Sequence, residues 1–136
     1  MKKLKFSQLD DKYKSLVKEA VNVKKMAKTN ITHFSVGASI LLEKGEIISG
    51  CNVEFSTLAP SICAERNAIS TMIANGKNKF DVICICGDKP NTFPCGVCRQ
   101  TIYEINDEAI VLVVNSEDEI LMTDIKTLLP EGFKYE

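Results

Sequence analysis

Apolar residues recur every three or four positions near the start of the chain, and this pattern predicts a helix over residues 9–28. The apolar side of this helix consists of Leu9, Tyr13, Leu16, Val17, Ala20 and Val23. The same periodicity predicts helices over residues 63–75 and 95–106, and Thr123 could cap a last helical turn before Pro130. Apolar runs bounded by turn residues predict five strands, over residues 34–42, 46–51, 80–87, 109–114 and 119–122.

The predicted elements alternate between helices and strands after residue 52, an order that is typical of an α/β fold. Glu43, Lys44 and Gly45 separate the first two strands and predict a hairpin. We therefore expect a three-layer α/β/α sandwich, in which helices cover both faces of a five-stranded sheet. Neither a repeat nor a linker divides residues 1–136, so we expect a single domain.

Composition agrees with a globular protein, because hydrophobic residues make up 45% of the 136 residues and charged residues 26%. The net charge of −1 conceals an asymmetry. Residues 1–30 carry nine lysines and three acidic residues (net +6), whereas residues 31–136 carry eight basic and fifteen acidic residues (net −7). Lysine-rich surface helices are common, so the basic segment indicates a solvent-exposed helix face. We expect no nucleic-acid partner.

No apolar run approaches the roughly 18 residues that a membrane-spanning helix needs. The first residues meet charges before any apolar stretch, which argues against a signal peptide. We expect a cytoplasmic protein without a membrane partner, whose six cysteines stay reduced. Cys84 and Cys86 are two apart on a predicted strand, so we expect both to be small buried residues and Cys51 to have a structural role as well.

Two short motifs carry the candidate chemistry: Cys63-Ala64-Glu65-Arg66 and Pro94-Cys95-Gly96-Val97-Cys98-Arg99. Each lies at the start of a predicted helix, where free N–H groups and a partial positive charge favour thiolates. Three thiolates without an obvious fourth ligand are typical of a catalytic zinc site, which keeps one position open for water. Glu65 is placed to move protons without binding the metal. We expect His33, the only histidine, to be a surface residue.

The Cys95–Cys98 pair alone also fits two other kinds of protein, a redox enzyme and a zinc ribbon. A zinc ribbon predicts a fourth ligand and tolerance of changes at Glu65, and a thiol oxidoreductase predicts activity from Cys95 and Cys98 without metal. Neither alternative explains Asn52, Glu54 and Glu65 together. A cysteine, a glutamate two residues later and a distant Pro-Cys-x-x-Cys together match the arrangement of the zinc-dependent deaminases.

Five sequence blocks, spread over about residues 30–133, extend this match: FSVGA (34–38), GCNVE (50–54), CAER (63–66), PCGVCRQ (94–100) and LLPEGF (128–133). In this order they resemble the homotetrameric, zinc-dependent cytidine deaminase family. The resemblance implies a cytidine deaminase-like fold with a mixed sheet, one Zn²⁺ per chain, and pockets shared between subunits. It also implies hydrolysis of cytidine and 2′-deoxycytidine to uridine and 2′-deoxyuridine plus ammonia, a step of pyrimidine salvage.

The resemblance implies a role for each matching residue. Those that would bind zinc or act on it are the ligands Cys63, Cys95 and Cys98, the proton-transferring Glu65, and Arg66, which would hydrogen-bond the thiolates. Those that would bind the nucleoside are Asn52 and Glu54, which match the pair that hydrogen-bonds the ribose, together with Phe34, Ala64 and Phe133. In the family, a neighbouring subunit supplies the aromatic residue at the position of Phe133.

The sequence departs from the family pattern after Glu54, where Phe55 and Leu58 replace polar or phenolic groups. Relatives use this segment at the mouth of the pocket, so the range of substrates and the subunit interface stay open. The alternative substrate is another cytosine nucleoside, either blasticidin S-like or N4-modified. Related blasticidin S deaminases lack a glutamate at the position of Glu54, so its presence favours a ribonucleoside.

Overall fold

The computed structural model describes residues 1–135 of the chain. In chain order the elements are β1 (Lys2–Lys5), a 3₁₀ turn (Phe6–Gln8), α1 (Asp11–Lys24), β2 (Val36–Leu41), β3 (Ile47–Cys51), α2 (Ala64–Ala74), β4 (Val82–Gly87), α3 (Gly96–Ile105), β5 (Ile110–Val114), β6 (Glu119–Asp124) and α4 (Ile125–Leu128). The helix and strand order predicted from the sequence is confirmed from α1 onward.

The strands form one mixed sheet in the order β1-β6-β5-β4-β2-β3. β4 and β5 are parallel, and the other neighbouring strands are antiparallel. The predicted number of strands is wrong, because the sheet has six rather than five. The additional strand is β1, whose lysine-rich sequence carries no apolar alternation. It is held at the edge by pairing with β6, from Lys2 opposite Met122 to Lys5 opposite Glu119, and edge lysines are typical of strands that resist further pairing.

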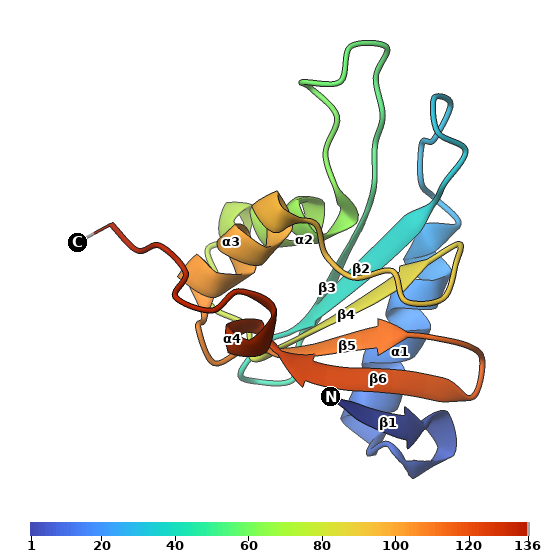
Figure 1. Ribbon diagram of the computed structural model, residues 1–136, viewed down its shortest axis with the longest axis vertical. Helices are drawn as coiled ribbons and strands as arrows, with labels where there is room; N and C mark the ends of the chain where they lie inside the picture. Colours follow the sequence, from blue (N-terminus) through green and yellow to red (C-terminus); the bar gives the residue numbers. More distant parts are fainter. Residues whose placement is uncertain (136) are drawn as a thin grey trace.

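Helices cover both faces of the sheet, which confirms the predicted three-layer sandwich (Figure 1). Under α1 lies one cluster of buried residues, which includes Leu16, Val17, Ala20, Cys84, Cys86 and Leu112. Under α2, α3 and α4 lies the other, which includes Ala68, Met72, Phe80, Ile83, Ile85 and Ile102. Successive β4 side chains alternate between the two clusters, as the pleat of a strand requires. Cys84 and Cys86 are therefore buried in the layer beneath α1, as predicted.

The ends of the elements differ from the predicted ones where a side chain or a distant segment takes over the backbone hydrogen bonds. α1 begins at Asp11 because the Asp10 carboxylate caps it, accepting from the Tyr13 N–H at 2.9 Å. It ends at Lys24, before residue 28, because the N–H groups of residues 25–27 bond three residues back in a turn, and the Lys28 N–H then donates to the Asn52 carbonyl. The last helix is capped by Asp124 rather than Thr123, and the carboxylate of Asp124 accepts from the Thr127 N–H.

α2 lies unusually close to β3 at Gly50. A Cβ atom at this position would lie 2.5 Å from the Ala68 nitrogen and 3.0 Å from the Ala64 carbonyl oxygen. These are backbone atoms of α2, so they can make room only if the whole helix shifts. The absence of a side chain at Gly50 therefore sets the height of α2, and of the residues at its N-terminus, above the sheet.

We predict that Gly50→Ala lowers the free energy of unfolding by about 1–3 kcal/mol, the usual cost of overpacking. Urea unfolding followed by circular dichroism measures this loss. Ser49→Ala, which changes the neighbouring residue of the same strand, is the control and should unfold like the wild type. Equal stability of Gly50→Ala and wild type would contradict the close approach of α2 to β3.

Candidate metal centre

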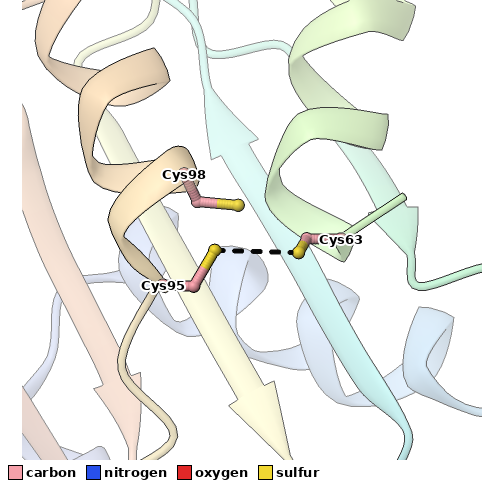
Figure 2. A group of neighbouring side chains, drawn as sticks. All are labelled: Cys63, Cys95 and Cys98. Atoms are coloured by element: carbon pink, nitrogen blue, oxygen red, sulfur yellow. Dashed lines mark hydrogen bonds between the residues drawn. The ribbon is translucent and has the colours of Figure 1, made fainter. Parts of the chain in front are cut away.

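Three cysteine side chains converge where α2 and α3 begin (Figure 2). Cys63 immediately precedes α2, Cys95 immediately precedes α3, and Cys98 lies in the first turn of α3. The three Sγ atoms all lie within 4.8 Å of one another, and those of Cys63 and Cys95 are 3.9 Å apart. His33 is exposed, with its backbone in the left-handed region (φ 57°), and is not part of this group.

The spacing and chemistry of these sulfurs fit zinc. With Zn–S bonds of about 2.3 Å, two sulfurs of a tetrahedral site lie about 3.8 Å apart, close to the separation of Cys63 and Cys95. The cluster contains three cysteines and no further histidine, cysteine or acidic ligand among residues 1–135. Three protein ligands are typical of a catalytic zinc site, whereas structural sites have four.

The surroundings favour a thiolate at Cys63. Its pKa falls to about 5, because the Cys98 thiol donates a hydrogen bond to it and the Arg66 guanidinium donates another at 3.6 Å. The pKa of Cys98 is raised in return, since its proton is held between the two sulfurs and the site is partly buried. The pKa of Arg66 is raised by the same contact with Cys63. Arg66 thus lies against the sulfur of Cys63 and offsets its negative charge.

Glu65, the second residue of α2, is 4% exposed. Burial raises its pKa to about 7, and the negative charge of Cys63 adds to this effect. A carboxyl group with a pKa near neutrality can both accept and release a proton during one reaction. The structure therefore places a group suited to acid–base chemistry beside the three cysteines.

A cavity of about 170 Å³ is lined by this glutamate together with Cys63 and Cys95. Its lining residues are Val36, Asn52, Cys63, Ala64, Glu65, Thr92, Phe93 and Cys95. The structure thus brings together Asn52, Ala64, Glu65 and two of the predicted ligands. A roomier cavity of about 530 Å³, between α1 and the turn after β5, contains none of the predicted site residues.

Sequence reasoning missed Val36, Thr92 and Phe93 as lining residues. Thr92 and Phe93 follow the carboxyl end of β4, next to a parallel strand and directly before Pro94. Ligands of open α/β sheets bind outside the carboxyl ends of strands, so this position was the available signal. Val36 gives no comparable signal, because an apolar first residue of a strand is ordinary.

Phe34, Glu54 and Phe133 do not line the cavity. Phe34 is half-buried and lies next to two residues that line the cavity, Asn52 and Val36. The Asn52 amide donates to the Phe34 carbonyl at 2.9 Å and accepts from the Val36 N–H at 2.8 Å. Glu54 is buried under residues 31–32, and its pKa is lowered chiefly by a hydrogen bond from the Thr32 hydroxyl. Phe133 is 63% exposed, and its carbonyl accepts from the Gln100 amide.

The segment that departs from the family pattern lies in the loop between β3 and α2. Leu58 is 77% exposed and Phe55 is 42% exposed. The Lys28 ammonium lies 4.8 Å from the centre of the Phe55 ring and also donates to the Glu54 carbonyl. Phe55 therefore makes a cation–π contact within this chain, which links the loop to Lys28 in the segment that follows α1.

Comparison with known proteins places this geometry in a family. Residues 10–114 match the family described as "Cytidine and deoxycytidylate deaminase zinc-binding region". The chain belongs to this family. The cytidine deaminase of Sporosarcina psychrophila is 34% identical over 123 residues, covering 89% of this chain and 90% of that protein. The blasticidin-S deaminase of Bacillus cereus is 32% identical over 104 residues, covering 70% and 74%.

Solved structures of the family have the same fold as this deaminase-family chain. The cytidine deaminase of Burkholderia pseudomallei superimposes with a TM-score of 0.81 at 29% identity, covering 89% of this chain and 98% of that one. The enzyme from Mycobacterium tuberculosis superimposes with a TM-score of 0.78 over 93% of this chain and all of that one, at 24% identity. The predicted cytidine deaminase-like fold is thereby confirmed.

We predict that the purified protein carries about one zinc ion per chain and that Cys95→Ala loses it, because two thiols bind zinc far more weakly than three. The melting temperature should fall with the metal, since a metal bound only by the folded state stabilises that state. Metal analysis and thermal unfolding of the same sample measure both. Cys51→Ala, which removes a thiol outside the cluster, is the control. Full zinc occupancy in Cys95→Ala would contradict the assignment.

Proposed function

We propose that this protein is a cytidine deaminase, which converts cytidine and 2′-deoxycytidine and water to the corresponding uridines and ammonia. The observation that carries the proposal is that the buried Glu65, with a pKa near neutrality, shares one cavity with Cys63 and Cys95. Family membership and the names of the relatives support the reaction type. Neither a zinc ribbon nor a thiol oxidoreductase accounts for Asn52, Glu54 and Glu65 together.

In this proposal Cys63, Cys95 and Cys98 hold the zinc ion. When bound, zinc supplies Lewis acidity, which lowers the pKa of water toward neutrality. Glu65 accepts a proton from the attacking water and delivers it to ring N3, so that C4 becomes more electrophilic. The oxygen adds to C4, and Glu65 passes the second proton of the water to the amino group. The C4–N bond breaks, ammonia leaves, and the proton on N3 stays in the uridine product.

Asn52 and Glu54 would bind the sugar, with Phe34 and Ala64 against the base. The buried carboxylate of Glu54 favours a ribonucleoside, because an ionised carboxylate is a strong acceptor for a sugar hydroxyl. The match to a blasticidin-S deaminase and the exposed Phe55 and Leu58 make blasticidin S and N4-modified cytidines the alternative substrates. Faster turnover of these compounds than of cytidine would support the alternative substrates.

A homotetramer with shared pockets is also part of the proposal. The cavity beside Glu65 measures about 170 Å³, below the roughly 300–1,000 Å³ of typical ligand sites, so one chain supplies an incomplete pocket. A groove between α2 and α3 has the apolar lining residues Ile62, Ile69, Ile73 and Ile105, and Ile73 is 54% exposed. An exposed apolar groove on the outer face of these helices supports a subunit interface there.

The cellular location is proposed to be the cytoplasm, where reducing conditions keep the ligand thiols available. Within residues 1–135, the helices all fall short of the length and apolar character that crossing a membrane requires.

We predict that Glu65→Gln retains zinc and loses at least about a hundredfold in kcat, the lower end of what a positioned acid–base group contributes. The decrease in ultraviolet absorbance as cytidine is deaminated measures the rate. Glu108→Gln, an exposed change just past the end of α3 opposite to Cys98, controls for the loss of one negative charge. Glu65→Gln activity within about tenfold of wild type would contradict the mechanism, since general acid–base catalysis accounts for more than that.

We predict that Phe133 acts in the pocket of a neighbouring subunit. Phe133→Ala and Glu65→Gln should each have low activity, and oligomers that contain both chains should recover part of it. Such a mixed oligomer contains pockets with an intact Glu65 from one chain and an intact Phe133 from the other. Glu65→Ala mixed with Glu65→Gln is the control and should recover nothing. Activity of the first mixture no higher than that of its parents would contradict a shared pocket.

A further inference from the structure

Glu54, the carboxylate proposed to bind the sugar, is almost fully occupied by protein donors. Its Oε1 atom accepts from the backbone N–H groups of Ile31 and Thr32, at 3.1 and 3.0 Å. Its Oε2 atom accepts from the Thr32 hydroxyl at 2.6 Å. A carboxylate offers about four acceptor directions, so these three bonds leave one, and that one is on Oε2.

The Thr32 hydroxyl connects Glu54 to a second residue of the proposed pocket. While it donates to Glu54, it accepts from the Phe34 N–H at 3.1 Å. The resulting chain of hydrogen bonds runs from Phe34 through one hydroxyl to the carboxylate, and bonds in such a chain strengthen one another. Removing the hydroxyl therefore frees both a carboxylate oxygen and the backbone of Phe34.

The backbone around this hydroxyl is held in one conformation. His33, between Thr32 and Phe34, has a left-handed backbone with a φ of 57°, which costs energy for a residue other than glycine. The segment that contains Glu54 is held as well: the Lys28 N–H donates to the Asn52 carbonyl, and the Lys28 carbonyl accepts from the Glu54 N–H. The two loops rise from the same end of the sheet in Figure 1. Together these hydrogen bonds fix the conformation of the turn that contains Thr32, and so the position of its hydroxyl.

We propose that Thr32 is a positioning residue for Glu54: its hydroxyl orients the carboxylate so that a single acceptor direction on Oε2 faces one hydroxyl of the substrate's sugar. The lowered pKa of Glu54 agrees with this arrangement, because all three donors stabilise the ionised form. This inference rests on the proposed cytidine deaminase function. It goes further by assigning a role to Thr32 and by limiting Glu54 to one sugar hydroxyl.

The test compares Thr32→Val, which removes the hydroxyl and keeps the shape, with Thr32→Ser, which keeps the hydroxyl. We expect Thr32→Val to raise KM for cytidine about tenfold, the worth of one charge-assisted hydrogen bond, with kcat within about twofold. Thr32→Ser should restore KM to within about twofold of wild type, because both hydrogen bonds of the hydroxyl can re-form. Thr127→Val, on the short α4, is the matched control for exchanging a surface threonine.

Nucleosides that lack one hydroxyl separate positioning from a general loss of structure. The substrates are cytidine and its 2′-deoxy, 3′-deoxy and 5′-deoxy analogues. Glu54→Gln should raise KM least on the one analogue that lacks the hydroxyl bound by Glu54. On that same analogue the effect of Thr32→Val on KM should also be smallest. An equal effect of Thr32→Val on every analogue, or no effect on any, would overturn the proposal.

A measurement that needs no activity tests the bond itself. Urea unfolding of Thr32→Val, Glu54→Gln and the double variant forms a double-mutant cycle. We expect the two single losses to add to more than the loss of the double variant, and strict additivity would overturn the contact. A wild-type protein that deaminates no nucleoside would overturn the proposed function and the sugar role together. The cycle would still report whether Thr32 holds Glu54, so the two failures are distinguishable.

Discussion

The whole site depends on two helices that begin side by side. Cys95 comes from the residue before α3 and Cys98 from its first turn, whereas Cys63 comes from the residue before α2, more than thirty positions earlier. Only the packing of both helices on one face of the sheet brings the three sulfurs within 4.8 Å of one another. Each helix start also contributes free N–H groups and a partial positive charge, which stabilise thiolates. Gly50, by admitting α2 close to β3, helps to set this spacing.

The same packing gives two neighbouring residues opposite acid–base character. Cys63 receives hydrogen bonds from Cys98 and Arg66, and its pKa is lowered. Glu65, two residues later, turns into the protein interior, where burial and the charge of Cys63 raise its pKa. Proximity to donors and cations stabilises a negative charge, whereas loss of water destabilises it. One helix start thus holds a readily ionised thiol, the proposed zinc ligand, and a carboxyl group with a pKa near neutrality, the proposed proton carrier.

The two side chains proposed to bind the sugar, Asn52 and Glu54, also hold the neighbouring backbone in place. Asn52 bonds to the backbone of Phe34 and Val36, and Glu54 bonds to that of Ile31 and Thr32. The polar side chains proposed to bind the sugar are therefore already held in place by the protein, and such preorganisation reduces the cost of binding. Phe55, which looks like a departure when only the sequence is read, contacts Lys28 at the same junction.

Several features followed from the sequence alone because they are local. Three- and four-residue periodicity placed α1, α2 and α3, and the two-residue period of a strand placed Cys84 and Cys86 on one buried face. The two cysteine motifs lay at helix starts as predicted, but the meeting of Cys63 with Cys95 and Cys98 depends on the packing of α2 and α3. The roles of Asn52, Glu54 and Phe133 came from resemblance to a family, and they stay predictions.

Other features were decided only by the tertiary structure. β1 has no apolar pattern, and it is a strand because its main chain pairs with β6, which lies more than a hundred residues later. α1 stops at Lys24, residues 25–27 form a turn whose N–H groups bond three residues back, and Lys28 bonds through its backbone to Asn52 and Glu54. Thr92, Phe93 and Thr32 carry no motif, and each gains its place from a neighbour that is distant in sequence. The period of a helix or strand is written in adjacent residues, whereas a cavity wall and an edge strand depend on long-range contacts that no local pattern specifies.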